Sequence, residues 1–186
     1  MPVYRKLLPQ ERRRYPGHLL RLERKDRYAR FTGTVSDAVI ERHCTTLDWG
    51  RTTVVGAFHQ GELRGAAELC TDRLIWPHEA ELAVSIETPF QGQGVGTALV
   101  RRALTIARNR GIAKVHMLAL ADNRRMRALA RHFGGTLDVD GGELAIAIGL
   151  PPPNQFSLAL EAFEAGAGAF GAVLDQWQGD MAERAA

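Results

Sequence analysis

The spacing of apolar residues changes twice between residues 79 and 119, and these changes predict a strand, a helix and a second strand. Segments 79–86 and 112–119 read as strands. Between them, over 94–110, the apolar side chains at helical spacing are Val95, Ala98, Leu99, Ala103 and Ile106. Gly111 is expected to end this helix, because glycine readily takes the left-handed conformation that follows many helices.

Similar patterns predict elements on both sides of this unit. Before it we expect strands and one clear helix, namely strands over 3–8, 52–58 and 63–70 and a helix over 36–44 that begins at Ser36. Residues 9–24 read as helical or irregular, with a break at Pro16-Gly17. After the unit we expect a helix over 123–133 and a hairpin made of strands 136–139 and 144–148.

The composition changes at residues 151–153, which are three prolines. Residues 156–177 are rich in alanine and glycine and read as a broken amphipathic helix. We therefore expect one domain over 1–150 and a helical C-terminal extension over 151–186. This extension could pack on its own domain, on a partner subunit or against an acceptor groove, and the first of these is favoured.

The overall composition is that of an ordinary globular protein. The 186 residues are 45% apolar and 24% charged, which suits one domain with a real core. No apolar run reaches the ~20 residues that span a bilayer, and the first residues lack the apolar segment of a signal peptide. Cys44 and Cys70 form neither the series of cysteines typical of a disulfide framework nor the spacing of a metal site. We therefore expect a cytoplasmic protein without a membrane partner.

Charge is distributed unevenly along the chain. Residues 1–30 hold ten Lys or Arg against three Asp or Glu, while the whole chain carries a net charge of +3. A basic segment of this kind could contact nucleic acid, but a solvated helix face is the favoured interpretation. The six histidines form no ligand spacing, so we expect no metal site.

The glycines of the loop before the central helix point to a phosphate ligand. Gly92, Gly94 and Gly96 alternate along the chain, and the helix that follows offers free backbone N–H groups and the positive end of its dipole. The loop has no lysine, so it is not a P-loop. Its G-x-G-x-G spacing also differs from the dinucleotide fingerprint, although Asp122 after the next strand keeps that alternative open.

The segment Gln91-Gly92-Gln93-Gly94-Val95-Gly96 resembles the Q/R-x-x-G-x-G/A signature of the GNAT N-acetyltransferases. Residues 80–84, Ala-Glu-Leu-Ala-Val, resemble a strand of bacterial protein lysine acetyltransferases, and residues 123–131 resemble the family's next helix. The resemblance implies an α/β (α+β) GNAT fold, with a mixed, mostly antiparallel sheet of about six or seven strands flanked by helices.

The same resemblance implies acetyl-CoA as co-substrate and assigns residues that bind it. The loop amides would hold the pyrophosphate, backbone groups of the strand would hold the acyl arm, and an asparagine would contact the pantetheine. In this chain these residues are Gln91, Gly92, Gln93, Gly94, Val95, Gly96 and Thr97, then Val84, Ser85 and Ile86, and finally Asn123. Ser85 could contact the ligand, but an ordinary strand residue is the favoured interpretation of its side chain.

Glu81 is the candidate general base, since an ammonium group must lose a proton before it can attack a thioester. Its apolar neighbours would raise the pKa of its carboxyl group, and the similar lysine acetyltransferases use the glutamate of this motif. The alternative is an exposed strand glutamate that pairs with Arg64 or Arg73. Glu79 and Glu68 are further candidates.

Many GNAT enzymes place a tyrosine seven residues after the asparagine, as the acid that protonates the leaving thiolate. This chain has Ala130 there, which leaves the acid unassigned. The sequence thus predicts an N-acetyltransferase that moves acetyl directly from the thioester to a protein lysine or a small amine. The alternative is a non-catalytic module that senses acetyl-CoA and regulates a partner. A homodimer is compatible with either function.

Overall fold

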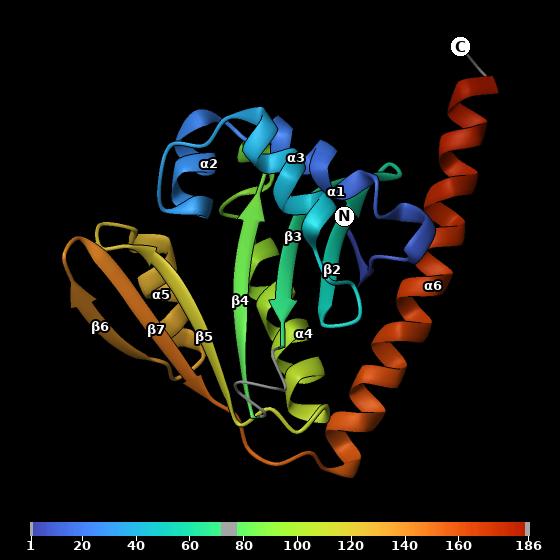
Figure 1. The fold of residues 1–186 in the computed structure, drawn as a ribbon. Coiled ribbons are helices and arrows are strands. Elements are labelled where there is room, and N and C mark those ends of the chain that lie inside the picture. Colours follow the sequence, from blue (N-terminus) through green and yellow to red (C-terminus); the bar gives the residue numbers. More distant parts are fainter. Residues whose placement is uncertain (1, 72–77, 185–186) are drawn as a thin grey trace.

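The computed structural model describes residues 2–71 and 78–184. Its strands are β1 (Val3–Lys6), β2 (Thr52–His59), β3 (Glu62–Cys70), β4 (Glu79–Ile86), β5 (Lys114–Leu120), β6 (Thr136–Asp140) and β7 (Glu143–Gly149). They form one sheet in the order β1-β2-β3-β4-β5-β7-β6 (Figure 1). All neighbouring pairs are antiparallel except β4 and β5, which run parallel. The predicted mixed, mostly antiparallel sheet is therefore confirmed.

Helices cover both faces of the sheet. They are α1 (Arg14–Arg21), α2 (Arg24–Phe31), α3 (Asp37–Thr46), α4 (Val95–Asn109), α5 (Arg124–His132) and α6 (Gln155–Arg184). On one face, α1 and α3 bury a core against β2 and β3 around Tyr15, Leu19 and Ile40. On the other face, α4 buries Leu99 and Ala103 in a larger core that includes residues of β4, β5 and β7.

The predicted break at Pro16-Gly17 is wrong. Helix α1 runs through both residues, and Pro16 is its third residue. The first N–H groups of a helix have no carbonyl partner inside it, so a proline there removes no hydrogen bond. A second short helix, α2, follows over Arg24–Phe31, a segment for which the sequence predicted no helix or strand.

Strands β4 and β5 pair over three residues only, Glu79–Glu81 with Lys114–His116. Beyond this point the two strands diverge, while β4 stays paired with β3 as far as Ile86 (Figure 1). The backbone N–H and C=O groups of residues 82–86 that face β5 therefore have no strand partner. Buried backbone groups need partners, so this edge is suited to bind a ligand by its main chain.

Helix α6 is continuous, which corrects the prediction of a broken amphipathic helix. It lies along β1 at the edge of the sheet and contacts α4 (Figure 1). Its glycines allow this close approach: a Cβ at Gly168 would lie 2.8 Å from the Cβ of Arg5, and one at Gly171 would lie 2.8 Å from a methyl of Val3. Larger apolar side chains of α6, such as Phe163 and Phe170, are exposed instead.

By length and composition alone, the segment Gln155–Val173 of α6 is also apolar enough to cross a membrane, and 11% of it is buried. Two glutamates inside this segment pair with the domain, Glu161 with Lys6 at 2.6 Å and Glu164 with Arg102 at 3.5 Å. These ion pairs, together with the glycine contacts, dock the helix on the sheet. The cytoplasmic location stays a prediction.

The glycines of α6 give a test of this docking. Gly168→Ala is expected to lower the unfolding free energy by about 1–3 kcal/mol, because the new methyl overlaps β1. Gly166→Ala is the matched control: its Cβ would meet nothing within 4 Å, so higher helix propensity should stabilise the protein by up to about 1 kcal/mol. Urea unfolding of both variants measures the difference, and equal effects of the two would contradict the docking.

Candidate functional site

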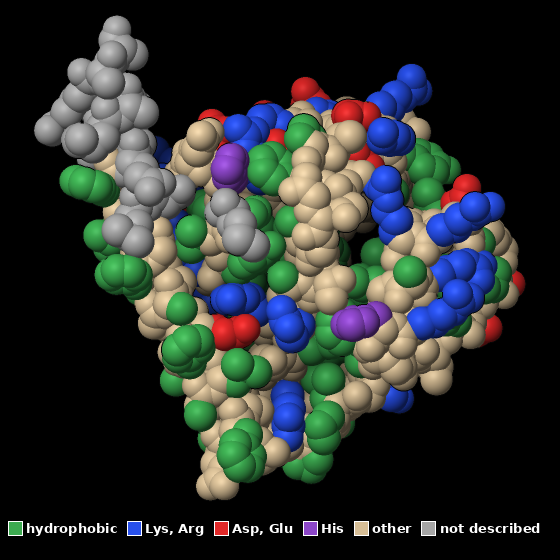
Figure 2. All heavy atoms as spheres, turned by 180° about the vertical axis from the view of Figure 1, so that it is seen from behind, with side chains coloured by type: hydrophobic (Ala, Val, Ile, Leu, Met, Phe, Trp, Pro, Cys, Tyr) green, Lys and Arg blue, Asp and Glu red, His purple; other side chains and the backbone are tan. Residues whose placement is uncertain are grey.

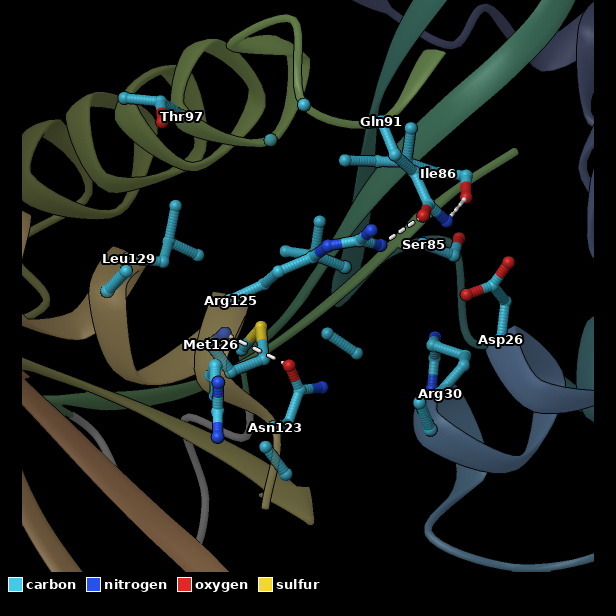
Figure 3. Close-up of a pocket in the computed structure, with 18 of the residues that line it drawn as sticks. Asp26, Arg30, Ser85, Ile86, Gln91, Thr97, Asn123, Arg125, Met126 and Leu129 are labelled. Atoms are coloured by element: carbon cyan, nitrogen blue, oxygen red, sulfur yellow. Dashed lines mark hydrogen bonds between the residues drawn. The ribbon is translucent and has the colours of Figure 1, made fainter. Parts of the chain in front are cut away.

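The divergence of β4 and β5 opens a cavity of about 790 Å³ (Figure 3). One wall is residues 82–86 of β4, and the opposite wall is formed by β5 and α5. The glycine loop closes one end, and Asp26, Ala29 and Arg30 of α2 reach it from the side of the sheet that carries α1 and α3. The cavity therefore reaches residues on both faces of the sheet.

The glycine loop has the backbone conformation that anion binding requires. Gly92 and Gly94 have φ of +74° and +78°, a region that side chains rarely allow, and Gly94 is the N-cap of α4. Gly96 has a different role: a Cβ there would lie 3.0 Å from Ile86, so glycine permits close packing of α4 on β4. The first N–H groups of α4 have no partner inside the helix and sit at its positive end. They are suited to a phosphate.

Gln91 connects this loop to both walls of the cavity. Its side-chain amide donates to the carbonyl of Ile86 at 2.8 Å, and its Oε1 accepts from the Arg125 guanidinium of α5 (Figure 3). The next glutamine, Gln93, donates to the carbonyl of Pro89 at 2.7 Å. Both glutamines thus fix the turn, and Arg125 adds a positive charge beside the loop amides.

The strand and helix residues predicted to bind the ligand also meet here. Val84, Ser85 and Ile86 line the cavity, and the side chains of Val84 and Ile86 pack against the core behind α4. Asn123 lines the opposite wall, and its Oδ1 accepts from the N–H of Met126 at 3.1 Å, as an N-cap does. Gln93 and Val95 are not among the lining residues, and Val95 is buried in the core.

Glu81 is exposed and does not line the cavity. It lies opposite Cys70 of β3 and His116 of β5, at the last pair before the strands diverge. Arg64, one of its suggested partners, pairs with Glu62 and Glu87 instead. The other suggested partner, Arg73, lies outside the described residues.

The two alternative carboxylates are held by other side chains. Glu79 pairs with His116 at 2.9 Å and with Lys114 at 3.6 Å. Glu68 is buried, and its Oε2 accepts from Tyr15, from Arg30 at 2.9 Å and from His43 at 3.0 Å. Burial opposes ionisation of Glu68, but these hydrogen bonds and the Arg30 charge outweigh it and lower its pKa. A lowered pKa makes Glu68 a weaker base.

A second buried polar cluster was not anticipated from the sequence. His18 of α1 has no exposed surface, and its Nε2 lies 2.9 Å from Ser85 Oγ while its Nδ1 lies 3.1 Å from Glu87 Oε1. Glu87 follows β4 and also accepts from Arg21 at 3.0 Å and Arg64 at 2.9 Å. The sequence carries no local signal for this cluster, because His18 is 67 and 69 residues away from Ser85 and Glu87 along the chain.

In the part of the chain that the structure describes, no group of His, Cys, Asp or Glu is arranged to hold a metal ion. The positive groups beside the cavity include the loop amides and Arg124 and Arg125 of α5. Figure 2 shows Lys and Arg side chains gathered beside a hollow on this face of the molecule. Amides at a helix N-terminus with a long adjoining groove suit a ligand with a diphosphate and an extended arm.

Comparisons with known proteins agree with this geometry. The chain is 29% identical over 144 residues to an acetyltransferase of Pseudomonas aeruginosa, an alignment that covers 74% of this chain and 77% of that one. Among solved structures, the GNAT domain of Streptomyces lividans PAT has a TM-score of 0.67 at 22% identity, covering 79% of this chain and 89% of that one. The PaiA N-acetyltransferase of Thermoplasma acidophilum, solved with coenzyme A, has a TM-score of 0.59 at 17% identity and covers 80% and 99%.

The profile of the acetyltransferase (GNAT) family matches residues 17–134, which is more than half of the chain. This match spans β4, the glycine loop, α4, β5 and α5, the elements that surround the cavity. The co-substrate of this protein is accordingly acetyl-CoA, and the reaction is acetyl transfer to an amine. The protein belongs to the GNAT family and is an N-acetyltransferase.

Proposed function

We propose that acetyl-CoA lies in the gap between β4 and β5, with its pyrophosphate on the amides of residues 91–97. Its pantetheine arm then runs along the unpaired backbone of residues 82–86 and faces Asn123. The observation that carries this proposal is the pairing of β4 with β5 over three residues only. A strand that loses its neighbour in mid-sheet offers main-chain groups in the pattern that the amides of a pantetheine arm can match.

Glu81 is the proposed general base, acting on the acceptor ammonium through water. Glu81 has the same strand parity as Ala83, which lines the cavity, and as Ser85. Its side chain therefore belongs to the face of β4 that carries α1 to α3, the face from which an acceptor would arrive. Its position one step outside the cavity wall is why a bridging water is needed.

The acceptor is proposed to be a primary amine, with a protein lysine favoured over a small molecule. Asp26 of α2 contributes a carboxylate to the wall of the cavity, which suits a cation (Figure 3). Arg30 beside it is neutralised by Glu68. The resemblance of residues 80–84 to protein lysine acetyltransferases gives the preference for a lysine side chain.

The second candidate function is an acetyl-CoA sensor without turnover. Two observations favour it: Ala130, at the position of the usual acid, is buried in the core, and Glu81 stands outside the cavity wall. Release of free thiol from acetyl-CoA, measured with lysine peptides and a panel of small amines, separates the two functions. Turnover on any acceptor supports the enzyme, and tight binding without turnover supports the sensor.

The role of Glu81 is tested by Glu81→Gln. We expect kcat to fall about 10²–10³-fold, because an amide cannot accept the proton, while the affinity for CoA measured by calorimetry stays unchanged. Glu143→Gln is the matched control, since Glu143 is also an exposed strand glutamate and does not line the cavity. Unchanged kcat in Glu81→Gln would remove Glu81 from the mechanism.

We further propose that two copies of the chain associate through the outer face of α6. The large apolar side chains exposed there are Phe156, Leu158, Leu160, Phe163, Phe170, Val173 and Trp177, and Figure 2 shows hydrophobic side chains along this edge of the molecule. Together they expose on the order of 800 Å², which is about the area that each partner buries in a standard protein interface. A two-fold pairing of α6 with itself would cover the face in both copies.

This dimer is tested with the double variant Phe163→Lys, Phe170→Lys. Sedimentation at micromolar concentration should give a dimer for the wild type and a monomer for the variant, because four charges in the pair would be buried. Val39→Lys replaces an exposed apolar residue of α3 and should remain dimeric. A wild-type monomer across the concentration range would contradict the proposal, and binding to lipid vesicles instead would assign the face to a membrane.

A further inference from the structure

A continuous chain of hydrogen bonds runs from the cavity wall into the protein. It begins at Ser85, passes through His18 and ends at Glu87, with donor–acceptor distances of 2.9 and 3.1 Å. Ser85 and Glu87 are each 6% exposed and His18 is fully buried. The chain presents a hydroxyl group, then a base, then an orienting carboxylate. Enzymes use this arrangement to activate a hydroxyl group as a nucleophile or proton donor.

The charges around His18 fix where its proton lies. The groups that face this cluster are Glu87, Arg21 from α1 and Arg64 from β3. Burial opposes the charge of Glu87, but its hydrogen bonds from His18, Arg64 and Arg21 lower its pKa to about 2. Glu87 is therefore a carboxylate that can only accept, so His18 Nδ1 must carry a hydrogen.

The remaining nitrogen of His18 is then free to act as a base. Burial lowers the pKa of His18, so the ring is neutral at physiological pH and its Nε2 bears a lone pair. Ser85 must donate its hydroxyl hydrogen to that nitrogen. The lone pairs of Ser85 Oγ are left for a partner in the cavity that Ser85 lines.

Ser85 is also placed where the reacting groups are expected. It lies on the stretch of β4 whose backbone is unpaired on the β5 side, between Val84 and Ile86. Asp26 is another cavity residue that could accept a proton on this side, and it already accepts a hydrogen bond from Thr88 at 3.0 Å. Glu68 and Glu79 are engaged elsewhere.

We propose that Ser85 Oγ, backed by His18 and Glu87, is a second catalytic group of the acetyl transfer, which takes the proton lost by the attacking amine and returns one to the sulfur of CoA. This inference rests on the proposed function. It also supplies the acid that Ala130 cannot provide.

Proton transfers accompany both the formation of the amide bond and the breaking of the thioester bond. The amine nitrogen forms a bond to the thioester carbon and passes a proton to Ser85 Oγ, while the hydroxyl proton of Ser85 moves to His18 Nε2. When the carbon–sulfur bond breaks, His18 returns its proton to Ser85 and Ser85 gives one to the thiolate. The net result moves one proton from nitrogen to sulfur. Glu81 removes the other proton, the one that converts the ammonium to the amine.

The direct test is steady-state acetyl transfer by Ser85→Ala on the best acceptor of the amine and peptide panel. We expect kcat to fall about 100-fold with the KM for acetyl-CoA almost unchanged, since the variant keeps the backbone that holds the acyl arm. Ser85→Thr retains a hydroxyl and should recover most of the loss. Ser157→Ala is the matched control. The buried hydroxyl of Ser157 in α6 donates to Asn109 of α4 at 2.6 Å, so loss of this hydroxyl should lower Tm but not kcat.

Double variants distinguish a relay from simple support of the fold. His18→Asn keeps a donor toward Glu87 but has no atom at the position of Nε2, so its kcat should fall as much as that of Ser85→Ala. The kcat of the double variant should fall no further than that of either single variant. Additive losses, or a kcat of Ser85→Ala above half of the wild-type value, would overturn the relay. So would a larger loss in Asp26→Asn than in Ser85→Ala, or an acetyl group found on Ser85 by mass spectrometry.

A measurement that needs no acceptor separates this inference from the proposed function. Nitrogen NMR of histidine-labelled protein should show His18 with its hydrogen on Nδ1 and a bare Nε2. A hydrogen on Nε2 overturns the relay whether or not any amine is acetylated. Absence of turnover in the wild type with the expected His18 signals contradicts the proposed function and, with it, the catalytic role of Ser85.

Discussion

The early loss of pairing between β4 and β5 is the constraint on which the rest of the site depends. Three residue pairs join the strands, and after them β4 continues beside β3 alone. The divergence creates the cavity and exposes the backbone of residues 82–86 to it. It also directs the end of β4 into the glycine loop, so that strand edge and helix N-terminus form one continuous polar surface.

Two buried carboxylates, Glu68 and Glu87, hold the helices that complete this surface. Arg30 of α2 pairs with Glu68 of β3, and Arg21 and His18 of α1 bind Glu87 at the end of β4. These contacts join α2 to β3 and α1 to the end of β4. Removing one partner from a buried ion pair is costly, so these contacts hold α1 and α2 in place beside the cavity. Several arginines of the basic N-terminal segment are used in this way, which leaves fewer of them for nucleic acid.

The fold and the glycine-loop side of the cavity could be predicted from the sequence because their signals are local. Positive φ at Gly92 and Gly94 and the cap at Asn123 depend on a few neighbouring residues. The side formed by α1 and α2 could not, since His18 meets partners 67 and 69 residues away. The sequence predicts α6 incorrectly for a different reason: Gly168 and Gly171 pack inward while its large apolar side chains face outward, the reverse of the usual pattern.

The central claim is that the gap between β4 and β5 holds the coenzyme. A crystal structure of the protein with CoA tests it most directly. We expect the pyrophosphate on the backbone amides of residues 91–97 and the pantetheine between β4 and Asn123. CoA bound elsewhere would contradict this proposal if the gap between residues 82–86 of β4 and residues 117–120 of β5 were empty.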